Sequence, residues 1–392
     1  MNLGPFDFQA RTRIIFGVGS VEGLGEVAGA LGGRRALVVS DPGVVRAGHV
    51  AVALAALQRA GLQTHVFDGV VENPTDECVE AGVAAARAVA TDLLVGLGGG
   101  SSLDCAKAIG VLLRNGGRIA DYGGVGQVPA PLPPLVAVPT TAGTGSEVQS
   151  AALISDSRTH HKMLIWDHHL APPVAILDPG LTVTLPPRVT ALTGIDAIAH
   201  ALESHVTARA TRLSAIFSGA AWRLLAPAFR QVLRAPSDVT ARAEMLLGAT
   251  LAGLAIENSM LGAAHACANP LTAHYGIPHG AAVALMLPHV IRFNGREPGI
   301  RERYGALAAA VGLAPGSEGE GAAGEANAAD LLADHLAALR AAAGLPARLA
   351  ECGVEEDRLP ELAAEAAGQH TAQFNPRRVS VAELLELYRR AY

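Results

Sequence analysis

Strand-like and helix-like segments alternate along the first half of the chain. Two runs with helical periodicity, residues 45–60 and 76–90, lie between short segments rich in Val, Leu and Ile. Strand–helix–strand alternation at this spacing is typical of a parallel sheet covered by helices. The sequence therefore predicts an α/β domain with strands at residues 36–41, 64–71, 92–100, 134–141, 151–155, 161–166 and 174–179.

At Pro186 and Pro187 the pattern changes from alternating strands and helices to helices alone. Proline suits the first turn of a helix, so a helix is expected to begin here. A chain of 392 residues also exceeds what one hydrophobic core usually supports. We predict an α/β dinucleotide-binding domain over residues 1–183 and an all-helical domain over residues 184–392. The second domain contains a Gly- and Glu-rich stretch, 312–327, expected to be a surface excursion. Its predicted helices are 187–206, 212–234, 240–256 and 380–391.

Charge and hydropathy argue against several classes of partner. The net charge is −6 and no block of Arg and Lys occurs, so nucleic acid is not an expected partner. The apolar stretch 245–256 is shorter than the ~20 residues that span a bilayer. The first residues carry early charges and lack the apolar core of a signal peptide. Four scattered cysteines form no CxxC pair, which favours reduced thiols and a cytoplasmic location: Cys78, Cys105, Cys267 and Cys352.

The segment GLGGGSSLDCAKAIG, residues 96–110, follows a predicted strand and begins a helix. Consecutive glycines let backbone N–H groups approach a phosphate, and the helix N-terminus adds a favourable dipole. A Gly-rich turn alone also occurs for purely geometric reasons. The strand–turn–helix context favours phosphate binding, although the turn follows the third predicted strand and not the first, as in an ordinary Rossmann domain.

Other polar residues follow the ends of neighbouring predicted strands. Asp41 would accept hydrogen bonds from ribose hydroxyls and repel a 2′-phosphate, which favours NAD over NADP; it would equally suit an Asp-Pro turn. Asn73 either contacts the ribose or belongs to a helix cap. The segment VPTTAGTGSEV, residues 138–148, places small hydroxyl side chains at another strand end. These would line a pyrophosphate or ribose site in an open α/β sheet, or form a plain polar loop.

A possible metal site lies in the helical half. Asp196 and His200 are four residues apart, so they share one helix face. They form either a paired polar spot or half of a metal site. The segment 263–280 holds the densest histidines, His265, His274 and His279. One carboxylate with several imidazoles suits Zn²⁺, Fe²⁺, Mn²⁺, Co²⁺ or Ni²⁺. We interpret Cys267 as a small core residue and expect His205 to face solvent.

Together these segments resemble the iron-containing alcohol dehydrogenase family, which shares its fold with glycerol dehydrogenase and dehydroquinate synthase. The resemblance covers nearly the whole chain. It is carried by the combination of ENPT (72–75), GGGSSLDCAKAIG (98–110), PTTAGTGSEV (139–148), LDPGLTVTLPP (177–187), TGIDAIAHALE (193–203), HACANPLTAHYGIPHG (265–280), LPHVIRFN (287–294) and FNPR (374–377).

The resemblance implies a set of site residues. Four metal ligands, taken as the catalytic residues, would be Asp196, His200, His265 and His279; His274 matches no ligand position. Many family members carry a second histidine four residues after the third ligand, where this chain has Asn269, which cannot titrate near neutrality. The implied cofactor contacts are Asp41, Asn73, Gly98, Gly99, Gly100, Ser101, Thr140, Thr141, Thr144 and Lys162.

The implied activity is metal-dependent hydride transfer between NAD(H) and a small primary alcohol or aldehyde, with NADP less favoured. The family implies Fe²⁺, while Zn²⁺ or another divalent ion also suits the ligands. The closest rival is a zinc-dependent glycerol or polyol dehydrogenase. A lyase similar to dehydroquinate synthase is another, although residues 190–290 are poor in Lys. We also expect a homodimer or higher homo-oligomer, built by strand pairing through the extended segment FQARTRIIFG (8–17).

Overall fold

The computed structural model describes residues 5–159, 162–313 and 327–392. Most of the predicted surface excursion at 312–327 therefore lies outside the described residues. The chain divides into two compact units, Phe8–Leu185 and Pro186–Tyr392, the latter joined by residues 5–7. We call them the sheet unit and the helical unit.

The sheet unit contains a six-stranded parallel sheet with the strand order β1-β9-β6-β4-β2-β3. This confirms the predicted parallel α/β architecture. The sheet strands are β1 (Arg13–Phe16), β2 (Arg35–Val39), β3 (Gln63–Phe67), β4 (Leu93–Gly98), β6 (Leu135–Pro139) and β9 (Val174–Leu177). The helices are α1 (Leu24–Ala30), α2 (Pro42–Arg46), α3 (His49–Arg59), α4 (Asp76–Ala88) and α5 (Gly100–Asn115).

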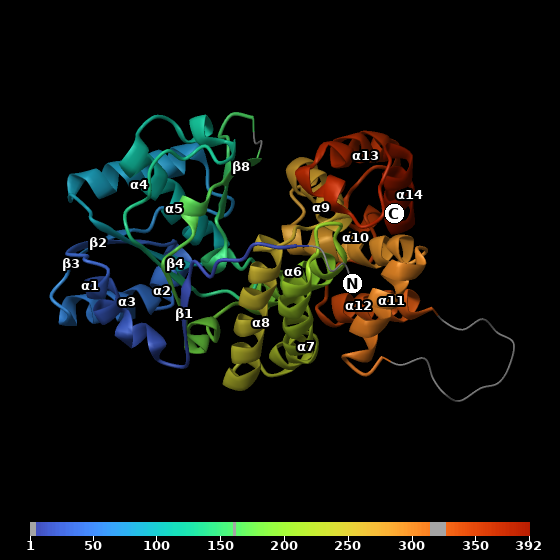
Figure 1. The fold of residues 1–392 in the computed structure, drawn as a ribbon, viewed down its shortest axis with the longest axis horizontal. Coiled ribbons are helices and arrows are strands. Elements are labelled where there is room, and N and C mark those ends of the chain that lie inside the picture. The colour runs from blue at the N-terminus through green and yellow to red at the C-terminus, as the bar shows by residue number, and fades with distance from the viewer. Residues whose placement is uncertain (1–4, 160–161, 314–326) are drawn as a thin grey trace, which may run out of the picture. The chain divides into compact units, whose positions relative to one another are not determined.

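Helices cover both faces of this sheet, α1 and α3 on one side and α4 and α5 on the other (Figure 1). Successive side chains of a strand point to opposite faces, so β2 contributes to two separate cores. Val38 packs with the apolar residues of α1 and α3, whereas Leu37 and Val39 pack with those of α4 and α5. Because helices cover both faces of the sheet, the central strands β4 and β6 are buried along their full length.

The segment 8–17 contributes β1, an edge strand that pairs with β9 on one side, so its predicted role in pairing with a second chain stays a prediction. Two other predictions for the sheet unit need correction. The predicted helix 45–60 is interrupted before His49 because Gly48 adopts a left-handed φ of 84°. The strands β7 (Ala151–Ser155) and β8 (Lys162–Trp166) pair antiparallel and join β5 (Gly124–Val125) in a second sheet. A parallel pair needs a crossover of a dozen or more residues, and the link between β7 and β8 is too short for one.

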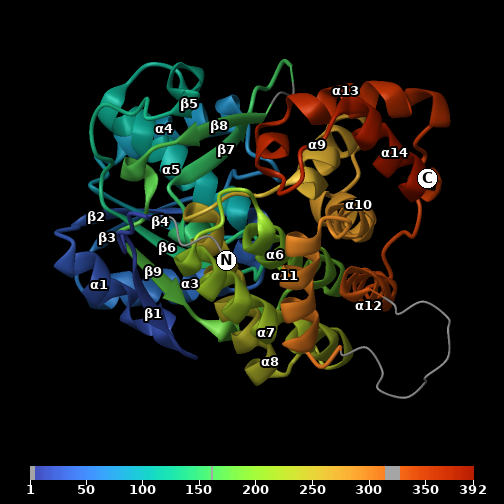
Figure 2. The ribbon, with the colours of Figure 1, turned by 45° about the vertical axis from the view of Figure 1, so that its right-hand side comes forward.

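The helical unit consists of nine helices in the part of the chain that is described, and its helix-rich character is confirmed. Helices α6, α7 and α8 pack against one another, and α10 contacts α6, α9, α12 and α14 (Figure 2). The helices are α6 (Pro187–Val206), α7 (Arg212–Arg234), α8 (Val239–Glu257), α9 (Ala263–Tyr275), α10 (His279–Asn294), α11 (Pro298–Ala309), α12 (Ala328–Ala342), α13 (Leu359–Gly368) and α14 (Val381–Ala391).

Helix α8 is, within the described ranges, the one helix long and apolar enough to cross a membrane. However, 61% of its apolar window is buried inside the protein. It packs against α6 and α7. Burial against other helices is the property of a core helix, which explains its all-round apolar character.

The prediction that His205 faces solvent is wrong. His205 is buried in α6, and its Nδ1 lies 2.9 Å from the Ser218 hydroxyl of α7. Burial lowers the pKa of His205 to about 4, and the nearby guanidinium groups of Arg303 and Arg223 act in the same direction. The imidazole is therefore neutral in the folded protein.

We expect this histidine to make stability depend on pH. Below the unfolded-state pKa of about 6.5, the unfolded chain binds a proton that the folded chain rejects. The free energy of unfolding should thus fall as the pH drops from 6.5 towards 4, by up to about 3 kcal/mol from this residue. Urea unfolding of wild type and His205→Gln between pH 6.5 and pH 4 measures this loss of unfolding free energy. An equal pH slope in both proteins would contradict the prediction.

Candidate metal centre and cofactor site

Three helices of the helical unit bring the predicted ligands together. Asp196 and His200 come from one face of α6, and His265 comes from the first turn of α9. His279 is the first residue of α10. A Cβ on the next residue, Gly280, would lie 2.1 Å from the carbonyl oxygen of Leu192 in α6. Only glycine allows α10 to begin so close to α6, and this holds His279 beside Asp196.

The three imidazoles surround one carboxylate oxygen. The distances from Asp196 Oδ1 are 3.4 Å to Nε2 of His265, 3.6 Å to Nε2 of His200 and 3.8 Å to Nε2 of His279. Donor atoms bound to one tetrahedral metal at about 2.1 Å lie about 3.4 Å from each other. The observed spacing therefore fits ligands that share a single cation.

Burial makes this arrangement costly without a cation. Asp196, His200 and His265 are buried, while His279 is partly exposed. Among the described residues, neither Asp196 Oδ1 nor His265 Nε2 has a hydrogen-bond partner. Buried polar atoms normally have one, so these two atoms indicate a ligand at their centre. One carboxylate and three imidazoles suit a borderline divalent ion such as Fe²⁺ or Zn²⁺.

The pKa shifts of Asp196 and His265 also indicate a cation at the centre of the group. Burial alone would raise the pKa of Asp196, but the three facing imidazoles outweigh it and hold that pKa far below its usual range. Burial alone would lower the pKa of His265, but the carboxylates of Glu203 and Asp196 raise it. The site thus favours a positive charge at its centre, which a divalent cation supplies.

Glu203, which is not among the predicted site residues, orients the ring of His265. Its Oε2 accepts a short hydrogen bond from His265 Nδ1, and its Oε1 accepts the N–H of Ala264 at 2.8 Å. This fixes the tautomer that presents the Nε2 lone pair to the centre. Glu203 follows Asp196 by seven residues on the same helix, two full turns. That spacing was the signal that could have revealed it.

We expect Glu203→Gln to weaken metal binding by roughly 10–100-fold, because the amide removes the charge that supports the His265 tautomer. Titration of metal-free protein with Zn²⁺ measures this affinity directly. Glu365→Gln is the matched control, since Glu365 pairs with the exposed His274 at 2.8 Å. Equal Zn²⁺ affinity in both variants would exclude the orienting role.

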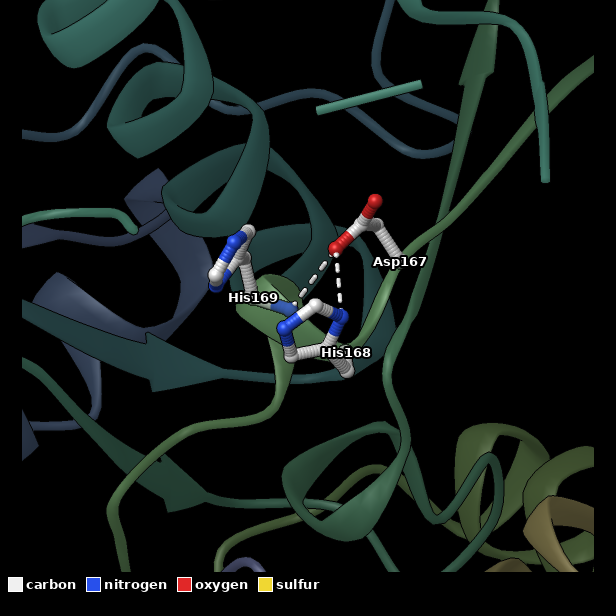
Figure 3. A group of neighbouring side chains, drawn as sticks. All are labelled: Asp167, His168 and His169. Carbon is white, nitrogen blue, oxygen red and sulfur yellow. Dashed lines mark hydrogen bonds and ion pairs between the residues drawn. The ribbon is translucent and has the colours of Figure 1, made fainter. Parts of the chain in front are cut away.

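A second group of potential ligands lies in the sheet unit, where Asp167, His168 and His169 are consecutive (Figure 3). The buried Asp167 carboxylate already accepts the N–H of His169 at 3.0 Å and that of Val128 at 3.2 Å. Its Oδ1 also lies 3.2 Å from Nδ1 of the exposed His168. These contacts cap a short helical turn and tie it to the neighbouring loop, so the group is explained as a local structural cap.

Most of the predicted cofactor residues lie at the carboxyl ends of β2, β4 and β6. A Cβ on Gly98 would lie 2.4 Å from Ser102 Oγ, and one on Gly100 would lie 2.6 Å from a methyl of Thr144. Gly99, the residue before α5, has no side-chain cap. The Gly-rich turn therefore presents backbone N–H groups at the start of α5 and lies against the loop of Thr141 and Thr144.

The remaining predicted contacts border this turn or lie further away. Asp41 Oδ1 caps α2 by accepting the N–H of Gly43 at 2.8 Å, and its Oδ2 accepts from Ser102 Oγ at 3.4 Å. The Asp-Pro turn is thus present, with one oxygen facing the Gly-rich turn. Asn73 has a left-handed φ of 52° and donates its N–H to Ser101 Oγ at 3.3 Å.

Thr140 donates its N–H to the Gly98 carbonyl at 2.9 Å, which joins the ends of β6 and β4. Lys162 lies in β8, outside the main sheet. It is near enough to Asp104 of α5 to act on that carboxylate electrostatically. Asn269 donates from its side-chain amide to Gln369 Oε1 at 2.9 Å, within the helical unit.

Comparison with known proteins covers both units. Residues 11–179 match the family described as iron-containing alcohol dehydrogenase, and residues 190–392 match the C-terminal domain of the Fe-containing alcohol dehydrogenase family. The 1,3-propanediol dehydrogenase of Citrobacter freundii is 36% identical over 100% of both chains. The NAD-dependent methanol dehydrogenase of Bacillus methanolicus is 34% identical over 96% of this chain and 97% of that protein. A crystal structure of 1,3-propanediol oxidoreductase matches with a TM-score of 0.93 at 35% identity, covering 99% of this chain and 100% of the other.

Proposed function

Because this chain belongs to the iron-containing alcohol dehydrogenase family, we propose that it interconverts small primary alcohols and aldehydes by hydride transfer with NAD(H), with Fe²⁺ as its metal. The observation that carries the proposal is the group of three imidazole nitrogens around Asp196 Oδ1. Two buried atoms of that group lack a hydrogen-bond partner among the described residues.

In this proposal Asp196, His200, His265 and His279 hold the metal. When bound, the metal acts as a Lewis acid that polarises the carbonyl oxygen of an aldehyde or stabilises the alkoxide of an alcohol. The protein keeps the four donors in place through the α6–α10 contact at Gly280 and through Glu203 behind His265. The burial of Asp196, His200 and His265 keeps water away from their ligand atoms and strengthens the local field.

The cofactor is proposed to bind to the sheet unit, where the turn of Gly98, Gly99 and Gly100 binds the pyrophosphate of NAD through its backbone N–H groups. Asn73, Ser101, Thr140, Thr141 and Thr144 border this anion site, and Lys162 is proposed to reach the ribose. The Asp41 carboxylate accepts from ribose hydroxyls and repels the 2′-phosphate of NADP. Its Oδ2 is the oxygen available for this, since Oδ1 caps α2.

Asn269 is not expected to carry the proton that the alcohol loses. An amide donates and accepts hydrogen bonds but does not titrate near neutrality. Its amide nitrogen is already held by Gln369. The proton of the alcohol therefore leaves through another group, such as water or a cofactor hydroxyl, and Asn269 contributes a fixed dipole.

The protein is further proposed to act in the cytoplasm as a homodimer or higher homo-oligomer. The four cysteines are free thiols, as expected in a reducing compartment. Exposed apolar side chains cluster on and around the edge strand β1, at Phe8, Ile14, Phe16 and Val18. An exposed edge strand is a natural site for pairing with a second chain. Light scattering on the purified protein measures the oligomeric state.

The proposed function is tested by measuring NADH formation from methanol, ethanol, 1-propanol, 1,3-propanediol and glycerol, each with NAD and with NADP. The metal content of the same sample is determined in parallel. We expect turnover of primary alcohols, a preference for NAD and one metal ion per chain. Turnover restricted to glycerol with Zn²⁺ bound would favour a polyol dehydrogenase. Absence of turnover with every alcohol and aldehyde by metal-loaded protein would refute the proposal.

A further inference from the structure

Two cysteines that are distant in sequence meet in the sheet unit. Cys78 lies in the first turn of α4 and Cys105 in the second turn of α5, and their sulfurs are 3.8 Å apart. Cys105 is fully buried, whereas Cys78 keeps 9% of its surface exposed. The proposed reaction uses neither thiol.

Close packing of α4 and α5 explains this contact. Gly82 follows Cys78 by one helical turn, and Ile109 follows Cys105 by one turn. A Cβ on Gly82 would lie 2.3 Å from Cδ1 of Ile109. The absence of that Cβ lets the two helices approach, and both sulfurs then fall on the facing surfaces one turn earlier.

The two thiols differ in reactivity. The contact with Cys105 lowers the pKa of Cys78, and the same contact together with burial raises the pKa of Cys105. Cys78 also occupies the N-terminal turn of α4, whose dipole favours a thiolate. Cys78, the less buried of the two, is therefore the better nucleophile, and the fully buried Cys105 lies within reach to resolve its oxidation product.

Both cysteines are connected to the Gly-rich turn of Gly98, Gly99 and Gly100. Cys105 follows Gly100, the first residue of α5, by five positions, and Cys78 N–H is capped by the Thr75 hydroxyl at 3.2 Å. The turn before Thr75 contains Asn73, which is hydrogen bonded to Ser101. A disulfide needs a sulfur–sulfur distance of about 2.05 Å, so the sulfurs must approach by about 1.8 Å. Whatever part of that movement the helix backbone takes up shifts the first turn of α4 relative to the Gly-rich turn.

We propose that Cys78 and Cys105 form an oxidative modification site that reacts with a small hydroperoxide, closes to a disulfide and thereby weakens NAD(H) binding. The Cys78 thiolate attacks one peroxide oxygen and breaks the O–O bond, which gives a sulfenic acid and hydroxide. Cys105 then loses its proton, and its sulfur attacks Cys78 Sγ. The S–O bond breaks and water leaves. Overall, two thiols and one hydrogen peroxide give one disulfide and two water molecules.

The effect on cofactor affinity rests on the proposed function, but disulfide formation does not. The experiment uses the full protein loaded with Zn²⁺, which has no redox chemistry with peroxide. After exposure to hydrogen peroxide, thiols are counted in denatured protein, the cysteine peptides are mapped by mass, and the NADH dissociation constant is measured by fluorescence. Dithiothreitol then tests reversal.

We expect the thiol count to fall from four to two, a linked pair of peptides containing Cys78 and Cys105, and a rise in the NADH dissociation constant of roughly fivefold or more that dithiothreitol reverses. Cys78→Ala and Cys105→Ala should each prevent the loss of affinity. Cys352→Ala, which removes the most exposed of the four cysteines, should behave as wild type.

Peptides linked through other cysteines, or four thiols after treatment, would overturn the modification site. A disulfide that leaves the NADH dissociation constant unchanged would overturn its link to the cofactor. Failure of the proposed cofactor site gives a different result, because the reduced wild-type protein would then not bind NADH at all.

Discussion

Alanine in place of His265 is expected to remove the bound metal and to lower turnover by roughly 10³-fold or more. Polarisation of the substrate oxygen by a metal is worth several kcal/mol, and about 4 kcal/mol corresponds to this factor. The variant loses the ligand nearest to Asp196 Oδ1 and leaves Glu203 buried without its imidazole partner. Metal analysis after dialysis and the rate of NADH formation measure the two effects.

His274→Ala is the matched control, because His274 lies on the same helix but pairs with Glu365 at the surface. It should retain metal and turnover. The sheet unit contains none of the changed residues, so NADH binding should persist in both variants. If His265→Ala kept the metal content and rate of wild type, the ligand assignment would be wrong.

The second large effect concerns stability and involves Lys107. Its side chain is fully buried in α5, and its ammonium donates to the carbonyl oxygens of Ser146, Gln149 and Ala151 at 2.7–2.9 Å. It also counters the charge of Asp104, whose pKa burial raises. This one side chain therefore holds the loop between β6 and β7 against the helix that begins at the Gly-rich turn.

We expect Lys107→Met to lower the free energy of unfolding by about 3–5 kcal/mol, because the change removes the ammonium donor from three buried carbonyl groups and the positive charge that counters Asp104. Urea unfolding followed by circular dichroism measures the change. Arg114→Met on the same helix is the control, since Arg114 is exposed and should change stability by less than about 0.5 kcal/mol. Similar unfolding curves for the two variants would show that the network contributes nothing.

Local sequence signals predicted the helical unit well. The predicted helices 187–206 and 212–234 have the bounds of α6 and α7. Pro187 begins the first helix, and Thr211 begins the second with a capping box. Such signals act within a few residues, so they can be read from sequence alone.

Sheet membership was harder to predict because it depends on distant partners. The strands β7 and β8 were identified within a residue or two, but nothing in their composition shows that they pair with each other and leave the main sheet. Equally, β1 is short and mostly exposed, and only its pairing with β9 makes it a sheet strand. Pairing of this kind is a tertiary property.

The residues of the candidate site also divide into those that local sequence signals reveal and those that depend on tertiary contacts. The four-residue spacing of Asp196 and His200 revealed their shared helix face, whereas His265 and His279 were assigned through family resemblance. No local pattern indicates that α9 and α10 bring their first turns to α6. Glu203 was missed although its spacing was readable, and the contact between Cys78 and Cys105 was unreadable because it depends on how α4 packs on α5.

The pairing of β1 with β9 has a consequence for how the chain acquires its structure. In the order of synthesis β1 is the first strand of the six-stranded sheet and β9 is the last. A nascent chain therefore holds its first strand unmatched until every other strand of that sheet has left the ribosome. During this interval the backbone N–H and C=O groups of residues 13–16 have no strand partner, so the emerging chain exposes an unpaired strand, the kind of segment that promotes aggregation during folding.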